Sequence, residues 1–395
     1  MTESLVLPPT ADLAALGRRG LVVGALAAIA SAAGLIANPA QFYRSYLVAF
    51  ALVFGIAFGS LAISMLHHMS GGAWGLVIRR ILEASSRTLP LVALFAVPLF
   101  FGLGHLYPWA DPARVAGDEI LRHRAVYMNP AGVAIRLAVC LLLGTVFAQA
   151  LSRMSKRQDD APDPGLERKM QLVAAPGLAL YCLLVTVIAI DLLMSLDPHW
   201  FSAIYGVYVV GGQALSGLAF TLVICLFLAR KGPMEHILQP RHVHDLGKLL
   251  LAFTMLWAYF ALSQFLIIWS GNLPEEIGFF HDRLTGGWGV VSLALALFHF
   301  AVPFVFLLSR NFKRNLGKLV WIAGLLLFMR WVDLFWLVAP SFHPGRLSLH
   351  ALDLTTPVAL FGIWLWSFAQ QLARRPLLPV NDSGLGAALE VHAHD

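Results

Sequence analysis

Apolar runs of about 20 residues alternate with short polar segments along most of the chain. A helix of that length is what crosses the hydrocarbon core of a bilayer. The pattern predicts ten membrane-spanning helices, at residues 20–37, 46–66, 89–106, 130–150, 172–194, 203–229, 247–269, 288–309, 317–339 and 353–373. We expect an all-α integral membrane protein, with a membrane domain at 20–375 between an N-terminal segment, 1–19, and a C-terminal tail, 376–395.

The basic residues gather on alternate sides of these spans. Of the 28 Lys and Arg residues, 20 lie in segments on one side, six lie on the other, and two, Arg136 and Arg330, lie within spans. Basic residues are enriched in cytoplasmic segments, so both termini are predicted to be cytoplasmic. The pair Arg18-Arg19 directly precedes the first apolar run, and we expect an uncleaved first span there.

Composition excludes several classes of protein. Apolar residues make up 58% of the chain, charged residues 13%, and the mean hydropathy is +0.73, values foreign to a soluble domain. The net charge of +6 is divided among short clusters, so we expect no nucleic-acid partner. The three cysteines lie within apolar runs without a C-x-x-C pair, which argues against an iron–sulfur cluster bound by this chain.

A short pattern occurs twice. Asp191-Leu192 is followed by Pro198, seven residues after the Asp, and Asp333-Leu334 is followed by Pro340 at the same spacing. Spans two to five and six to nine would then form two four-helix bundles, at about 42–200 and 203–342, with spans one and ten outside them. Four spans per unit would make the repeat parallel, with its pseudo-twofold axis along the membrane normal.

Five Arg, Asp or His residues lie within the predicted spans and at least three residues from either end: Arg136, Asp191, His299, Arg330 and Asp333. Charges are costly at that depth unless paired or hydrated, which makes them functional candidates. Arg330 and Asp333 are three residues apart, on one helical face, where they can form either a structural ion pair or a proton-exchange site. Asp191 has no basic residue within four positions, and Arg136 on the preceding span is its expected partner.

Histidines are the other candidates for proton transfer. His299 lies in the middle of the eighth span, four residues before Pro303, and is either a packed neutral ring or a relay. His105 lies near the outer end of the third span and is a weaker candidate. His67 and His68, at the cytoplasmic end of the second span, fit either a hydrated proton entrance or an interfacial cap.

No metal, haem or nucleotide site is predicted. Adjacent histidines on a helix point about 100° apart and chelate poorly, and a bis-histidine haem needs two rings at similar depth. The stretch 71–75 is rich in glycine but lacks the Lys of a phosphate-binding loop, so it is predicted to be a turn.

Several strings, in this order, resemble the NrfD-like (PsrC-like) membrane subunits of quinone-linked oxidoreductases, and more narrowly the ActF subunits of bacterial alternative complex III. They are Phe42-Tyr43-Arg44-Ser45-Tyr46, the run from His67 to Trp74, the run from Trp257 to Trp269, Asn272-Leu273-Pro274-Glu275-Glu276 and Arg330-Trp331-Val332-Asp333. The resemblance covers residues 20 to 375.

The resemblance implies a subunit of a quinol:electron-acceptor oxidoreductase in a bacterial cytoplasmic membrane, not catalytic alone. Its implied partners are a homologous ten-span ActC-like subunit, an ActB-like iron–sulfur subunit, multihaem cytochrome c subunits, small membrane subunits and lipids. Iron–sulfur clusters and haem c would belong to those partners, and menaquinone or ubiquinone would be the quinone. Quinol oxidation is associated mainly with the sister subunit, so this chain would bind a quinol, conduct protons or support assembly.

Two other functions fit the pattern. A structural membrane anchor needs only the spans and the ion pairs. A secondary transporter also has parallel repeats and buried charges, but usually with interrupted helices at corresponding positions, and Pro98 and Pro303 do not correspond in the repeat.

Overall fold

The ten predicted spans are present in the computed structural model, which describes residues 11–230, 234 and 237–389. The helices long and apolar enough to cross a membrane are α1 (Ala11–Ala37), α2 (Pro39–Ser70), α3 (Ala73–Ser86) with α4 (Leu89–Phe101), α8 (Pro130–Asp160), α9 (Pro164–Leu192), α10 (Tyr205–Arg230), α11 (Pro240–Gly271), α13 (Trp288–Ala294) with η4 (Leu295–Ala301) and α14 (Val302–Leu308), α16 (Leu316–Val338) and α17 (Leu352–Leu372). The chain is therefore a multi-pass membrane protein.

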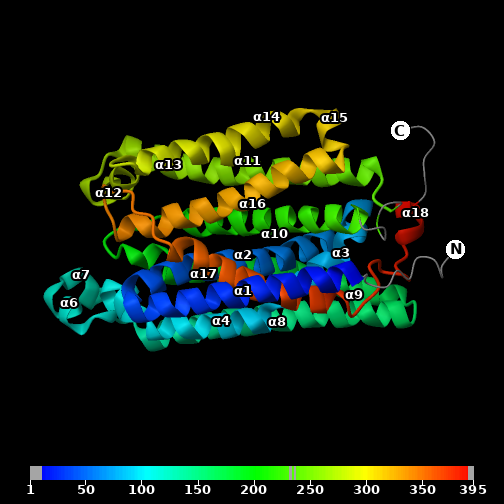
Figure 1. The fold of residues 1–395 in the computed structure, drawn as a ribbon. Coiled ribbons are helices and arrows are strands. Elements are labelled where there is room, and N and C mark those ends of the chain that lie inside the picture. Colours follow the sequence, from blue (N-terminus) through cyan, green and yellow to red (C-terminus); the bar gives the residue numbers. More distant parts are fainter. Residues whose placement is uncertain (1–10, 231–233, 235–236, 390–395) are drawn as a thin grey trace.

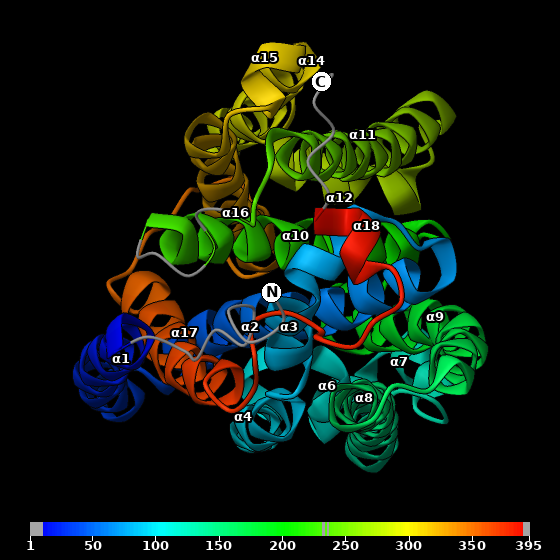
Figure 2. The same ribbon diagram turned by 90° about the vertical axis from the view of Figure 1, so that its right-hand side faces the viewer.

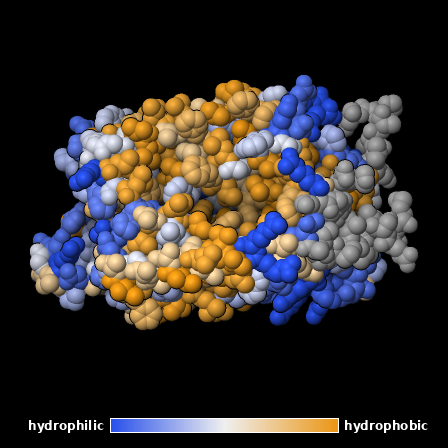
Figure 3. Space-filling view, in the orientation of Figure 1, coloured by the Kyte–Doolittle hydropathy of each residue, from blue (hydrophilic) through white to orange (hydrophobic). Residues whose placement is uncertain are grey.

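Short helices lie at the ends of the spans. They are α5 (Leu103–Leu106), η2 (Pro108–Ala110), α6 (Pro112–Gly117), α7 (Glu119–Arg124), η3 (Met194–Leu196), α12 (Pro274–Leu284), α15 (Arg310–Lys313), η5 (Ala339–Ser341) and α18 (Leu385–Leu389). Helices α6, α7 and α12 lie at one end of the bundle, the α12 end, while α15 and α18 lie at the other, the α18 end (Figure 1). A hydrophobic belt separates the two hydrophilic ends (Figure 3).

Several spans begin at a polar residue followed by proline. The side chains of Asn38, Asn129 and Asp163 accept hydrogen bonds from the first turns of α2, α8 and α9, and proline follows each of them. Such residues satisfy free backbone N–H groups, and proline at the first helical position loses no hydrogen bond. The helix starts are therefore encoded locally.

Two helices, α2 and α10, form the centre of the bundle and pack against each other. A Cβ at Gly59 of α2 would lie 1.9 Å from the carbonyl oxygen of Gln213, and one at Gly217 of α10 would lie 2.6 Å from the amide nitrogen of Ser60. Only glycine permits this approach, which brings the two helices into backbone contact.

The other spans surround this central pair in two groups. Helices α4, α8 and α9 pack with α2, and α11, α14 and α16 pack with α10 or with each other. Across the centre, α10 also contacts α9, and α2 also contacts α16. Helix α17 lies against α1 and α2, with α1 on the outside (Figure 2).

The third span differs from its prediction. Residues 73–86, between the second and third predicted spans, form the helix α3, whose residues from Gly75 to Ser86 are all buried. The span continues as α4 and ends at Phe101, so the predicted limits of 89–106 were too short at one end and too long at the other. Hydropathy missed α3 because Arg79, Arg80 and Glu83 interrupt its apolar residues and are neutralised only in the folded bundle.

The eighth span contains a stretch of π-helix, η4, which includes His299 and ends just before Pro303. A π-helical turn accommodates an extra residue and frequently marks a functional site. At the C-terminal end, the described part of the predicted tail packs against the bundle through the buried Leu377, Leu378 and Leu385. The described residues do not include residues 1–10 of the predicted N-terminal segment or residues 390–395 of the predicted tail. They also do not include Lys231, one of the basic residues between spans.

Candidate functional site

Asp333, in the half of α16 nearest the α12 end, is fully buried and bonded on both carboxylate oxygens. Arg330, one turn earlier on the same helix, donates to Oδ2 and forms the ion pair predicted from the spacing. The Tyr208 hydroxyl of α10 donates to Oδ1, and the Trp257 indole N–H of α11 donates to Oδ2 over 3.2 Å. Three helices therefore converge on one carboxylate.

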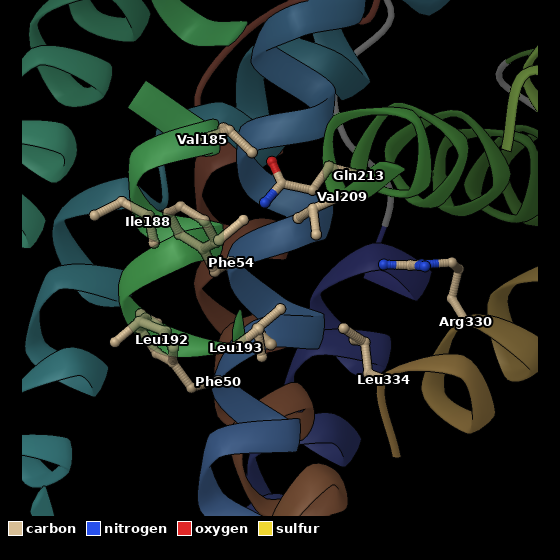
Figure 4. Close-up of a pocket in the computed structure, with 12 residues that line it drawn as sticks. Phe50, Phe54, Val185, Ile188, Leu192, Leu193, Val209, Gln213, Arg330 and Leu334 are labelled. Carbon is tan, nitrogen blue, oxygen red and sulfur yellow. The ribbon is translucent and has the colours of Figure 1, made fainter. Parts of the chain in front are cut away.

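The guanidinium of Arg330 lies over a glycine. A Cβ at Gly212 of α10 would lie 2.5 Å from the Arg330 Cζ atom, so any larger residue would displace the guanidinium. Arg330 itself is 2% exposed, and its Nε has no hydrogen-bond partner in the described part of the chain. Figure 4 shows the side chain reaching from α16 toward Gln213.

His299 lies beside this pair. Its ring centroid is 3.9 Å from that of Trp257, the residue that bonds Asp333. His299 is fully buried, and neither ring nitrogen has a hydrogen-bond partner among the described residues. The structure thus brings His299, which was predicted separately, into one cluster with the Arg330–Asp333 pair.

Asp191, at the end of α9, forms the second ion pair. Arg136 of α8 donates from Nε to Oδ2 over 2.6 Å and from Nη2 to Oδ1 over 3.2 Å, which confirms the expected partner. Arg136 Nη2 also donates to the Tyr127 carbonyl over 3.0 Å, and the Arg136 guanidinium lies 3.8 Å from the centre of the Tyr127 ring. Asp191 is fully buried, but the side chain of Arg136 is 22% exposed.

Tyr127 belongs to the segment between α7 and α8, outside the spans. Burial and the nearby Asp191 raise the pKa of its phenol, so the hydroxyl stays protonated at neutral pH. The ion pair of Asp191 is therefore covered by a residue from the α12 end of the molecule.

A narrow cavity of about 20 Å³ lies where α2, α9, α10 and α16 meet. Its wall is mostly apolar, and its polar members are Gln213 and Arg330 (Figure 4). Gln213 accepts a hydrogen bond from the Tyr181 hydroxyl over 3.0 Å. Leu192, the neighbour of Asp191, also lines it. The cavity therefore extends from Arg330 to the end of α9 that carries Asp191.

His67 and His68 line a separate polar cavity of about 160 Å³ at the α18 end. His67 Nε2 lies 3.1 Å from the Gly72 carbonyl, whereas His68 Nε2 is buried without a hydrogen-bond partner in the described residues. The rim includes Asp382 of the C-terminal segment, which forms an ion pair with Arg79 over 2.7 Å.

His105 lies elsewhere. It is exposed in α5, and its ring stacks on Tyr43 with 5.6 Å between centroids. None of the atoms of the two buried ion pairs bonds to it.

Sequence reasoning missed a buried ion network at the α18 end. Glu83 of α3 accepts from Arg80 over 2.8 Å and from Arg375 over 3.2 Å, and Arg80 also pairs with Asp159 of α8. Burial lowers the pKa of Arg375. The spacing of Arg80 and Glu83 is the same i, i+3 spacing that identified Arg330 and Asp333, and it was a usable signal.

A polar cluster at the α12 end was also missed. Asp353 of α17 accepts from Ser45 over 2.6 Å and from Gln41 over 2.9 Å, both on α2. Arg44 lies 3.4 Å from His343 Nε2, and burial, followed by the charge of Arg44, lowers the pKa of His343. The sequence placed Asp353 at the edge of a span, where its partners on α2 were not apparent.

Within residues 11–230, 234 and 237–389, no group of three or more His, Cys, Asp or Glu residues could hold a metal ion. No protein-family model matches the chain, and no curated protein matches it either.

Proposed function

We propose that the chain is an NrfD-like membrane subunit of a quinol:electron-acceptor oxidoreductase of the alternative complex III type, contributing a proton path and a quinol-linked site. The observation that carries the proposal is the pair of buried carboxylates, Asp191 and Asp333, each held by an arginine near the α12 end. Charges at such depth are retained mainly where they have a function.

The packing supports the parallel repeat. Helices α9 and α16 are the last helices of the two proposed units, and each carries one of the carboxylates. Each also packs on the first helix of the other unit, since α10 contacts α9 and α2 contacts α16. A twofold axis between α2 and α10, along the membrane normal, would exchange these contacts.

The proposed orientation puts the α18 end in the cytoplasm of a bacterium. Basic residues predominate at that end, and the positive-inside rule then places Asp191 and Asp333 toward the outer face. The ten-span sister subunit, the iron–sulfur subunit and the cytochromes would complete the complex.

Oxidation of a quinol to a quinone releases two electrons and two protons. In the proposal the electrons pass to iron–sulfur and haem groups of partner subunits, and carboxylates at the outer side accept the protons. His299, beside the Asp333 pair, would carry protons taken up from the cytoplasmic side, where His67 and His68 line a polar cavity.

One observation favours a second function, that of a structural anchor in the same kind of complex. Both oxygens of Asp333 already have donors, so its carboxylate stabilises three helices without any proton transfer. Loss of the carboxylate should reduce proton movement if it belongs to a proton path. It should leave the protons moved per electron unchanged if the carboxylate only stabilises the helices.

The test begins with purification of the tagged chain from its native membrane. The proposal expects haem-absorbing and iron–sulfur partners to purify with it, whereas a transporter should purify alone. Asp191→Asn, Asp333→Asn and His299→Phe should then lower the number of protons moved per electron. The control is Asp160→Asn, an exposed carboxylate paired only with Lys156 at the end of α8. Unchanged proton stoichiometry in all three variants would exclude these residues as the route.

A further inference from the structure

A group of five basic side chains lies together at the α18 end. It consists of Lys248 on α11, Arg310 and Lys313 on α15, Arg314 after it, and Lys318 on α16, and is called here the α15 basic cluster. Helices α11 and α15 pack together. Hydrophilic atoms gather over α15, where the hydrophobic belt ends (Figure 3).

The charge of this cluster is uncompensated in the described part of the chain. Lys248 pairs with Asp245 over 3.0 Å, but Arg310, Lys313, Arg314 and Lys318 form no ion pair there. Some basic residues at the same end are paired, such as Arg79 with Asp382 and Arg80 with Glu83, whereas others, such as Arg153 and Arg168, also form no ion pair in the described part of the chain. Membrane topology requires basic residues at one end of a span but does not require them to be unpaired.

Lys313 is built into the fold. It is only 7% exposed, and its aliphatic stem crosses α11 at Gly247, where a Cβ would lie 2.8 Å from the Lys313 Cγ. Burial, followed by the charge of Lys248, lowers the pKa of its ammonium group. The packing thus fixes the stem, while the ammonium group itself is not among the buried unpartnered atoms and can reach an anion at the surface.

A buried ring nitrogen lies near Lys313. His244, one turn before Lys248 on α11, has a buried Nδ1 without a hydrogen-bond partner in the described residues. An unpartnered buried nitrogen costs free energy that a ligand oxygen or a water could recover. The cluster thus combines a lysine held in one position with a ring nitrogen that has no hydrogen-bond partner in the described residues.

Lipid-facing apolar residues adjoin the cluster. Val305, Phe306 and Leu308 of α14, directly before α15, are 63%, 47% and 57% exposed. An occupant that uses both surfaces has an anionic head and apolar chains. That combination favours a lipid over a free anion or an acidic protein surface.

We propose that the α15 basic cluster binds the phosphodiester headgroup of an anionic phospholipid, with the acyl chains lying along α14. Lys313 contacts the phosphate from its fixed position, and the exposed Arg310 and Lys318 add long-range attraction. This site does not depend on the proposed redox function.

The test uses the chain in its purified assembly, exchanged into detergent and titrated with phosphatidylglycerol or phosphatidylcholine, with bound lipid counted by native mass spectrometry. Wild type should bind phosphatidylglycerol at least tenfold more tightly than phosphatidylcholine. Lys313→Gln and Arg310→Gln should each reduce that preference severalfold. Lys156→Gln, the same charge change at the same end but outside the cluster, should leave it intact.

Arg310 is exposed, so Arg310→Gln remains informative even where Lys313→Gln does not fold. An inorganic phosphate arm separates the two sources of a phosphate group. Displacement of phosphatidylglycerol by millimolar phosphate would indicate a small-anion site and overturn the proposal. Equal binding of both lipids would overturn it, as would loss of an acidic partner subunit from the variants without loss of lipid.

Discussion

The two buried ion pairs are built differently. Arg330 and Asp333 lie on one helix, are almost completely buried, and depend on α10 and α11 for the remaining hydrogen bonds. Arg136 and Asp191 lie on neighbouring helices, and the side chain of Arg136 is 22% exposed and also donates to the carbonyl of Tyr127.

The difference concerns how each charge is neutralised. A sealed pair must find every partner within the protein, because water cannot replace a lost one. The partly exposed pair can recruit water when a partner is removed. We therefore expect the Asp333 cluster to tolerate substitution poorly and the Asp191 cluster to tolerate it better.

The largest effect should come from removing the carboxylate charge. Asp333→Asn leaves the buried Arg330 without a counterion and should lower the free energy of unfolding by about 3–5 kcal/mol. Asp191→Asn should lower it by about 1–3 kcal/mol, because Arg136 is partly exposed and keeps its hydrogen bond to the Tyr127 carbonyl. Unfolding of both variants is followed in mixed micelles with rising SDS.

A double replacement checks the cause. Arg330→Met with Asp333→Leu removes both charges, and most of the lost stability should return, since apolar residues often replace a buried pair without cost. A double variant as unstable as Asp333→Asn would mean that the ion pair itself, rather than an orphaned charge, supplies the stability.

The tyrosines offer the next comparison. Tyr208→Phe removes a fully buried donor to Asp333 and should cost about 1.5–3 kcal/mol. Tyr127 is 42% exposed, so removal of its hydroxyl in Tyr127→Phe should lower the free energy of unfolding by less than about 1 kcal/mol. Equal losses in the same SDS titration would contradict a difference between a sealed and an open pair.

A glycine packs directly under the guanidinium of the sealed pair. Gly212→Ala would push a methyl group into the guanidinium of Arg330, and overpacking of this kind costs about 1–3 kcal/mol. The matched control is Gly324→Ala in α16, where nothing lies within 4 Å of the added Cβ, and a gain of about 0.5–1 kcal/mol is expected. Equal changes in the free energy of unfolding for Gly212→Ala and Gly324→Ala would show that Arg330 is free to move.

The sequence predicted the parts of this site that depend on local spacing or on depth in the membrane. The i, i+3 spacing was sufficient for Arg330 and Asp333, and the lack of a basic neighbour on its own helix directed Asp191 to Arg136. The ten spans followed from hydropathy because their apolar runs are long.

Other parts could not be read from the sequence because they depend on which helices meet. Tyr208 and Trp257 are unremarkable members of apolar runs until α10 and α11 bring them to Asp333. The helix α3 was missed because hydropathy counts Arg80 and Glu83 as solvated charges, whereas the fold buries them as partners.

The smallest expected effect is at His299. His299→Phe keeps an aromatic ring beside Trp257 and removes two buried nitrogens that have no partner among the described residues. Because no hydrogen bond within that part of the chain is lost, the free energy of unfolding should stay constant or rise by up to about 1 kcal/mol. A loss above about 2 kcal/mol in the SDS titration would mean that the ring bonds to bound water. Unchanged stability together with fewer protons moved per electron would assign His299 to proton transfer rather than to packing, a separation that Asp333, needed for stability itself, does not allow.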